Sequence, residues 1–429
     1  MKSDNAFLQV DKLTALEKNY GMLRIGMLTL IYYVELFWLF IDTVSGFFQN
    51  NGILFAGQTI AALFRIFVFG LLVTIVVRYF NIIKKTPLFF LAFVALLIPI
   101  HAVLYEMDLP EILTNFQFQL KMLMSIFLYY VLYIQMKTRA ISALQLKNII
   151  VFNSVVLVVN VYLGIFGIGF GSYGEDALGE QLGSKGFFYA GNEVSITLVA
   201  IYGLLCYQYR ETLKKYLWKF IFLILVFFVA SISLLSKTAM LGFVLITLFS
   251  IHRFLSLRNK LKVMTFSTLS LLATVSLWMP ILEVAIDRWL FHLDIHSDLI
   301  YFITSGRSER IGDLGNLIFN APSVLSLVFG YGWIAEKGRF SFENDFFDAI
   351  GVFGPLGLAF SLTWIGWMIS GFKVYIQKRS INGIFTGYAM LIIILISFIA
   401  GHVLMSVMAA PFVALVALVV SKYYPSELS

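Results

Sequence analysis

The stretch SFENDFFDAIGVFGPLG, residues 341–357, places three carboxylates, Glu343, Asp345 and Asp348, directly before a long apolar run. Asn344 or Ser341 can cap a helix that starts near Asp345, because carboxylates in a first helical turn are favoured by the helix dipole. That interpretation explains Asp345 and Asp348 but leaves Glu343 outside the first turn. A carboxylate at this place can also accept the proton of an attacking hydroxyl group, so the three acids are candidate catalytic residues.

A pair of arginines precedes this stretch. In YFITSGRSERIGDLGNL, residues 301–317, Thr304 or Ser305 can cap a helix, and Arg307 and Arg310 then lie three positions apart on one face. Two guanidinium groups side by side can clamp a phosphate or pyrophosphate, since each gives forked hydrogen bonds and neither loses its charge. The alternative is a pair of solvated surface arginines.

Charged side chains also interrupt the apolar runs, at Glu35, Arg65 and Lys121. A charge inside a membrane is costly unless it meets a partner or water. One interpretation is an ion pair between Glu35 and Arg65 or Lys121 that fixes the packing of the helices. The other is a hydrated, positively charged cavity that opens outward, with three further groups at its rim: His101, Glu193, and Lys237 in the predicted turn Ser236-Lys237-Thr238.

The composition indicates what kind of elements must position these groups. Of the 429 residues, 60% are hydrophobic and 13% charged, against about 25% charged in soluble domains. The sequence therefore predicts an all-α polytopic membrane protein with about 12 transmembrane helices, each near the ~20 residues that cross a bilayer. The predicted spans are residues 25–41, 56–77, 87–104, 113–134, 149–170, 194–209, 220–235, 239–254, 263–281, 350–372, 384–400 and 407–420.

Basic residues predict the orientation of these spans. With the N-terminus in the cytoplasm, most of the 31 lysines and arginines fall in cytoplasmic segments, as the positive-inside rule requires. Twelve spans then place both termini in the cytoplasm. The net charge of +7 is explained as a topology signal, and we expect no nucleic-acid partner. The first apolar run is long enough to span, so no cleavable signal is predicted.

The spans divide the chain into membrane helices one to nine (residues 1–282), one large extracytoplasmic loop domain between helices nine and ten (residues 283–349), and membrane helices ten to twelve (residues 350–429). A loop of that length usually carries function. No internal repeat is evident, which disfavours transporters built from two related halves. His292 and His296 are four residues apart, but without a third ligand they do not predict a metal site.

Four sequence stretches together resemble the O-antigen ligase and polymerase superfamily, including Wzy-type surface polysaccharide polymerases. Glu343-Asn344, nine residues, then Gly354-Pro-Leu-Gly357 is similar to the family's His-Asn, nine residues, Gly-x-x-Gly, with glutamate where ligases have histidine. GFFYAGNEVS (186–195), SKTAMLGF (236–243) and SGRSER (305–310) followed by FGYGW (329–333) agree in order and in membrane side. The resemblance covers roughly residues 150 to 370.

The resemblance implies a GT-C-like, metal-independent, inverting glycosyltransferase without cofactors, in the bacterial cytoplasmic membrane with its active site outside. Its substrates would be undecaprenyl-pyrophosphate-linked oligosaccharide and the growing lipid-linked polysaccharide, with a chain-length regulator as a further candidate partner. Arg307 and Arg310 would bind the pyrophosphate, and Lys237 stands where the family has a second arginine. The remaining candidate substrate-binding residues are Arg65, Lys121, Asn192 and Asn344.

The absence of the ligase histidine favours a polymerase that joins repeat units of O-antigen, capsule or exopolysaccharide. Glu343, supported by Asp345 or Asp348, would then activate the acceptor hydroxyl. The alternatives are a ligase of the same superfamily, which moves finished glycan to another acceptor, and a polysaccharide flippase or transporter, whose marks would be two-fold symmetry and broken helices near the midplane.

Overall fold

The computed structural model describes residues 26–55, 58–83, 86–172, 183–296, 323–332, 344–377, 381–399, 401, 403 and 405–420. Within these ranges the chain is helical, and the only β-type pairings are two isolated bridges, Phe55 with Gln58 and Phe170 with Gly186. The first helix is Gly26–Leu36. The others are α2 (Trp38–Asn50), α3 (Ile60–Arg78), α4 (Thr86–Leu104), α5 (Leu109–Lys137), α6 (Ala143–Ile165), α7 (Gly191–Gln208), α8 (Arg210–Lys215), α9 (Leu217–Ser233), α10 (Lys237–Phe254), α11 (Leu257–Ala273), α12 (Val275–His296), α15 (Val324–Phe329), α16 (Asp345–Gln377), α17 (Ile381–Ile399) and α18 (Ala410–Val420).

Five of the described helices, α3, α4, α5, α6 and α10, are long and apolar enough to cross a membrane on their own. Two bent pairs raise the number to seven: Gly26–Leu36 with Trp38–Asn50, and Leu257–Ala273 with Trp278–Val284. This supports a multi-pass membrane protein. Each predicted span overlaps a helix, but the predicted count of 12 spans is not reached by length and composition in the described residues, partly because α18 has only 11 residues.

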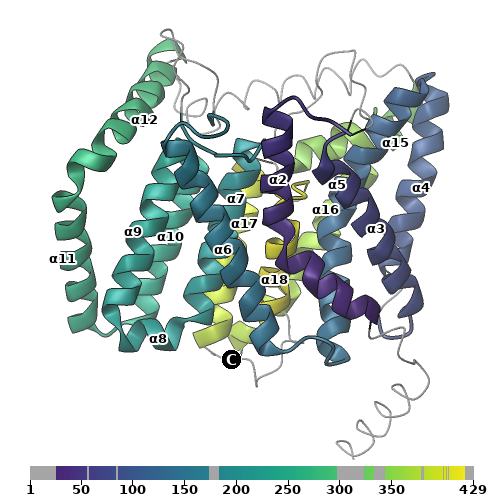
Figure 1. Ribbon diagram of the computed structural model, residues 1–429. Helices are drawn as coiled ribbons and strands as arrows, with labels where there is room; N and C mark the ends of the chain where they lie inside the picture. Colours follow the sequence, from purple (N-terminus) through teal and green to yellow (C-terminus); the bar gives the residue numbers. More distant parts are fainter. Residues whose placement is uncertain are drawn as a thin grey trace, which may run out of the picture.

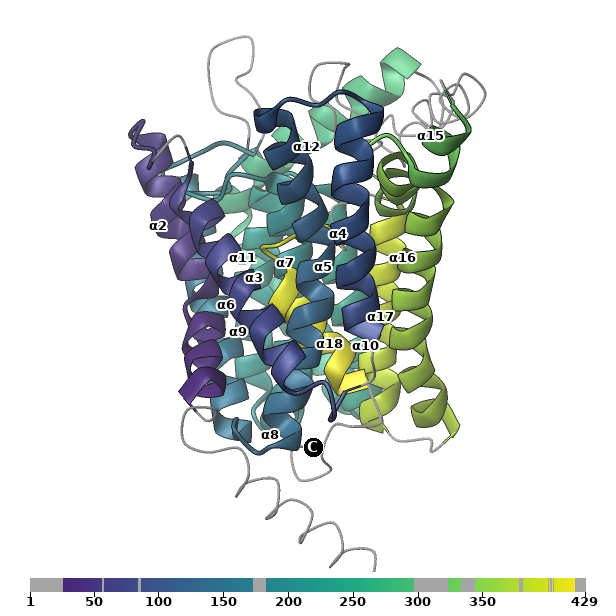
Figure 2. The same ribbon diagram turned by 90° about the vertical axis from the view of Figure 1, so that its right-hand side faces the viewer.

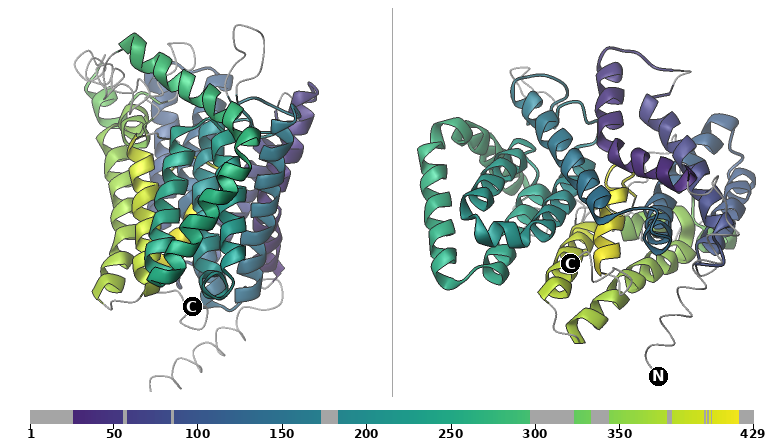
Figure 3. Two further views of the ribbon diagram at one scale, coloured as in Figure 1. Left: turned by 90° about the vertical axis from the view of Figure 1, so that its left-hand side faces the viewer. Right: turned by 60° about the horizontal axis from the view of Figure 1, so that its bottom comes forward.

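The helices stand side by side in one bundle, with α8 at one end and the C-terminal part of α12 at the other (Figure 1). α5 packs against α3, α4 and α18, and α7 packs against α6, α10, α17 and α18. Figure 2 shows α18 behind α3 and α5, with α16 and α17 at the side of the bundle. α11 and the first part of α12 stand at the opposite side and pack mainly on α9 (Figure 3).

A break separates α17 from α18. α17 ends at Ile399 and α18 begins at Ala410, with Gly401 at a positive φ of 62° between them. The 11 residues of α18 rise about 16 Å, roughly half of the ~30 Å hydrocarbon core of a bilayer. Residues 405–419 are all buried. Non-helical backbone at membrane depth occurs only where protein or a water-filled cavity surrounds it, so this buried break is a feature that the fold has to support.

A second irregularity bends the first helix pair by 56° at Phe37. The buried side chain of Asn153 from α6 enters the bend: its Oδ1 accepts from the Leu39 N–H at 3.0 Å, and its Nδ2 donates to the carbonyls of Glu35 and Leu36. In a regular helix the Leu39 N–H would bond to the Glu35 carbonyl. The inserted amide replaces that bond and so causes the bend.

Candidate functional site

α16 begins where the sequence predicts. Asn344 precedes its first residue, and the Asn344 Oδ1 accepts from the N–H groups of Phe346 and Phe347 at 3.0 and 3.3 Å. This confirms the predicted cap and the start at Asp345. Asp345 and Asp348 lie in the first turn and are almost fully buried, 1% and 2% exposed.

Asp345 accepts hydrogen bonds from the segment around the break between α17 and α18. Its Oδ2 accepts from the Ser397 hydroxyl at 2.6 Å and from the Val403 N–H at 2.9 Å. Buried backbone groups that leave a helix need such acceptors, and a carboxylate is the strongest one available. The predicted catalytic candidate Asp345 therefore has a structural role, because it fixes the first half of the break to the start of α16.

Glu193 accepts hydrogen bonds from the residues of the same break that directly precede α18. Its Oε2 accepts from the Ser406 hydroxyl at 2.9 Å and, at 3.4 Å, from the Met408 N–H. Glu193 lies in the first turn of α7, next to the half-buried Asn192. Two of the stretches noted in the sequence, GFFYAGNEVS and ENDFFDAIGVFGPLG, thus meet through one interrupted helix.

The predicted ion pair of Glu35 is wrong in the described part of the chain. Arg65 instead pairs with Asp42 of α2, Nη2 to Oδ1 at 2.9 Å, while Glu35 makes no ion pair there. Asp42 also interacts electrostatically with Glu193. Sequence reasoning missed Asp42 because it sits at the edge of a predicted span. Only the 23-residue separation of Asp42 and Arg65 on consecutive helices could have suggested the pair.

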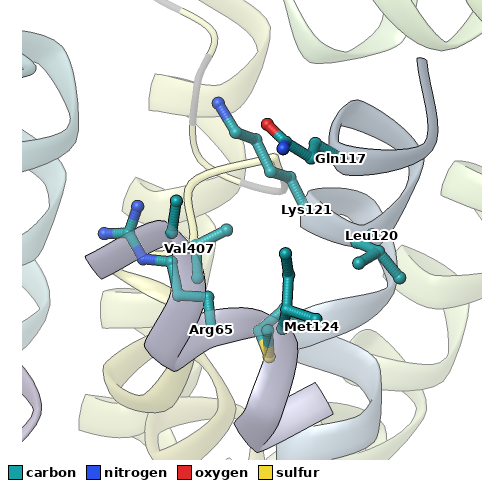
Figure 4. Close-up of a pocket in the computed structure, with 8 residues that line it drawn as sticks. Arg65, Gln117, Leu120, Lys121, Met124 and Val407 are labelled. Carbon is teal, nitrogen blue, oxygen red and sulfur yellow. The ribbon is translucent and has the colours of Figure 1, made fainter. Parts of the chain in front are cut away.

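A cavity of about 60 Å³ lies between α3, α5 and the break. Its polar lining is Arg65, Gln117 and Lys121, and its apolar lining is Ala62, Ile66, Leu120, Met124 and Val407. Figure 4 shows Lys121 and Gln117 extending together from α5, with Arg65 facing them from α3. Arg65 and Lys121, which the sequence predicts as members of one positively charged cavity, thus line the same cavity.

The two cations that line this cavity differ in their pairing. Arg65 is compensated by Asp42, whereas Lys121 has no ion pair among the residues that the structure describes. Lys121 is flanked by apolar side chains, and the carboxylate of Glu193 binds Ser406 and Met408 on either side of the lining residue Val407. A charge in such surroundings favours an anionic ligand that brings apolar surface with it.

The two glycine-containing stretches FGYGW and GVFGPLG lie against each other. The N–H groups of Tyr331 and Gly332 donate to the carbonyls of Gly351 and Val352 at 2.8 and 3.0 Å. Gly330 and Gly354 both have positive φ, and a Cβ on Gly330 would lie 2.4 Å from the Gly354 nitrogen. Only glycine allows this approach, which interrupts α16 at Gly354.

Two residues at the end of α4, His101 and Tyr105, contact the backbone of Phe329 and Gly330. The His101 Nε2 lies 2.9 Å from the Phe329 carbonyl, and its Nδ1 lies near the amides of Asn115 and Gln119. The Tyr105 hydroxyl donates to the Gly330 carbonyl at 2.9 Å, and burial raises the pKa of that hydroxyl, which keeps it protonated as a donor. His101 is therefore a buried anchor and not an open rim residue.

Lys237 is the first residue of α10 and not part of a turn: Leu235, with a φ of 51°, closes the turn, and Ser236 caps the helix. The loop before α7 is attached to the end of α9: the Ser184 N–H donates to the Ser233 carbonyl at 2.7 Å. The predicted donor-site lysine thus lies half-buried at a helix start beside the 183–190 segment.

Glu343, Arg307 and Arg310 lie outside the described residues, as do Ser341, Thr304 and Ser305. Their predicted roles as base and pyrophosphate clamp stay predictions. His292 and His296 lie in α12, and no group of three potential metal ligands occurs among the residues that the structure describes.

Comparison with known proteins does not assign the chain: no protein-family model, no curated protein and no solved structure matches it.

Proposed function

We propose that this protein is a polysaccharide polymerase that joins undecaprenyl-pyrophosphate-linked repeat units on the outer face of the cytoplasmic membrane. The observation that carries the proposal is the cavity between α3, α5 and the helix break, where Lys121 lies among apolar side chains and has no ion pair within the described residues. A lipid-linked phosphate has the complementary chemistry, an anionic head on an apolar chain.

In the proposed reaction an acceptor sugar hydroxyl attacks the anomeric carbon of the donor. The new C–O bond forms as the bond from that carbon to the pyrophosphate oxygen breaks, and the lipid pyrophosphate leaves with the electron pair. Positive charge stabilises this leaving group. Lys121 supplies it within the described part of the chain, beside Arg65, which is paired with Asp42. Arg307, Arg310 and Lys237 are the further candidates.

Glu343 is the proposed base that takes the hydroxyl proton, because Asp345 is occupied in binding Ser397 and Val403. Glu343 directly precedes Asn344, whose cap bonds fix the start of α16. Asp345 then acts as a positioning residue, and Asp348, buried one turn later, supports the same helix start.

The variant Glu343→Gln tests this assignment in cells that need this protein to make their surface polysaccharide. The variant keeps the size and loses the base, so polymer should shorten to single repeat units. Glu106→Gln, at an exposed carboxylate, is the matched control and should leave the chain length unchanged. Long polymer in the Glu343 variant would remove that residue from the role. Accumulation of full polymer on the lipid carrier would instead indicate the ligase alternative.

A transporter or flippase is the second candidate, and the break between α17 and α18 favours it, because interrupted helices at membrane depth often form transport sites. Reconstitution separates the two. A transporter moves labelled lipid-linked oligosaccharide across the bilayer of vesicles and leaves its size unchanged, whereas a polymerase forms longer glycan without any requirement for movement.

A further inference from the structure

Glu35 is a fully buried carboxyl group, with 1% of its surface exposed. Neither of its side-chain oxygens has a hydrogen-bond partner in the described part of the chain. Three residues further on, the indole N–H of the fully buried Trp38 is likewise without one. Both groups flank the bend at Phe37.

None of the charged residues on the neighbouring helices forms an ion pair with Glu35 in the described part of the chain. The first helix contacts α5 through the Gln135 amide, which donates to the Leu28 carbonyl, and contacts α6 through Asn153. Asp42 and Arg65 pair with each other, and Lys147 of α6 lies over the Tyr209 ring at 4.8 Å. The other charged residues of α3 and α5 make no ion pair with Glu35: Arg78, Glu111, Lys121 and Lys137.

An ionised carboxylate in this place would have neither an ion pair nor a hydrogen bond among the residues that the structure describes. Burying an isolated charge costs far more than burying a neutral polar group, so the group takes up a proton instead. A metal cation is no substitute for the proton, because such an ion needs several oxygen ligands and no group of three potential metal ligands occurs within the described ranges. We infer that Glu35 is a proton-binding site in the interior of the bundle, occupied at neutral pH in the bent conformation.

Protonation of Glu35 is coupled to the angle between the two helices that meet at Phe37. Asn153 satisfies the backbone groups of Glu35, Leu36 and Leu39 only while the helix pair is bent. Release of the proton leaves a carboxylate that must reach water or a cation, and the side chain can do so only if the bend moves. Proton release from Glu35 and a change of the bend are therefore one event. This inference does not depend on the proposed transferase activity.

Infrared spectroscopy of the intact protein in lipid nanodiscs tests the proton site. At neutral pH the wild type should show the C=O stretch of a protonated carboxyl group, and Glu35→Gln should lose it. Glu106→Gln changes an exposed carboxylate and should keep the band. Identical spectra for the wild type and Glu35→Gln would overturn the inference. If the glutamine variant does not fold, wild type labelled with ¹³C-glutamate decides: no protonated glutamate band at neutral pH also overturns it.

Distance measurement between two spin labels tests the link to the bend. Leu30 and Phe47 are exposed on either side of Phe37, at 44% and 49%, and Cys206 can be replaced by serine so that labels attach at Leu30→Cys and Phe47→Cys alone. Raising the pH should change the distance in the wild type once Glu35 ionises, and should leave it fixed in Glu35→Gln. An equal pH response in both, or none in the wild type after the infrared band has disappeared, would contradict the coupling.

Discussion

Glu193 and Asp345, on helices α7 and α16, bind opposite halves of one helix break: Glu193 accepts from Ser406 and Met408, and Asp345 accepts from Ser397 and Val403. The two acids are 152 residues apart in sequence. Through them the break becomes the place at which the stretches GFFYAGNEVS and ENDFFDAIGVFGPLG meet.

Removal of the Asp345 carboxylate should loosen the break. Asp345→Ala deprives two buried donors of their acceptor, and hydrogen bonds to charged groups contribute about 1.5–3 kcal/mol each. Thermal unfolding in detergent should occur at a clearly lower temperature than in the wild type. Glu106→Ala, at an exposed site, is the control. Equal stability of the Asp345 variant and the control would show that the carboxylate does not hold the break.

Loss of the Lys121 charge should weaken donor binding. Lys121→Met keeps the aliphatic length but removes a charge-assisted contact of about 1.5–3 kcal/mol, which corresponds to roughly ten- to a hundredfold in affinity. Lys121→Arg should retain most of it. Binding of undecaprenyl pyrophosphate to the purified protein is the measurement, with Lys215→Met at an exposed site as the control. If Lys121→Met binds as tightly as the wild type, the cavity is not the donor site.

The contact between Gly330 and Gly354 should not tolerate a side chain. Gly354→Ala places a Cβ 2.3 Å from the Val328 carbonyl oxygen at a φ of 68°, and a non-glycine residue in a sparsely populated backbone region costs about 1–3 kcal/mol before the clash is counted. Gly70→Ala lies in α3 with nothing within 4 Å of the added Cβ and should be neutral or slightly stabilising. Thermal unfolding of both variants checks this, and equal melting temperatures would be inconsistent with the packing described.

Asn153 should be needed for the bend. Asn153→Leu has nearly the same shape but leaves buried backbone groups of Leu39 and Glu35 without a partner, at about 1–3 kcal/mol for each group. The helix pair either straightens or loses stability, and hydrogen exchange at the Leu39 amide should increase. Asn51→Leu, whose amide caps an exposed carbonyl, should change neither. Unaltered protection at Leu39 in Asn153→Leu would be evidence against this cause of the bend.

Much of the fold follows from the sequence because apolar length and helix caps are local signals. The start of α16 at Asp345 and its cap at Asn344 are confirmed, and every predicted span overlaps a helix. The bend at Phe37 and the break between α17 and α18 could not be predicted in this way, because the residues that stabilise them are distant in sequence. Asn153 lies more than 100 residues after the bend, and Glu193 lies more than 200 residues before the break.

In the candidate site, too, the sequence identifies single residues but not their partners. Arg65 and Lys121 stand out in the sequence as costly charges in apolar runs, and they do line one cavity. Their partners could not be assigned, since ion pairing depends on the rotation of each helix, and Asp42 takes the role predicted for Glu35. Composition likewise gives no warning that Glu35 stays unpaired within the described residues.

The most direct measurement of the central proposal is glycan synthesis by the purified protein in nanodiscs, supplied with an undecaprenyl-pyrophosphate-linked oligosaccharide. A polymerase should yield a ladder of products one repeat unit apart, with release of undecaprenyl pyrophosphate, and Lys121→Met and Glu343→Gln should yield much less product. Wild-type protein that binds this lipid yet forms no new glycosidic bond would contradict the proposal.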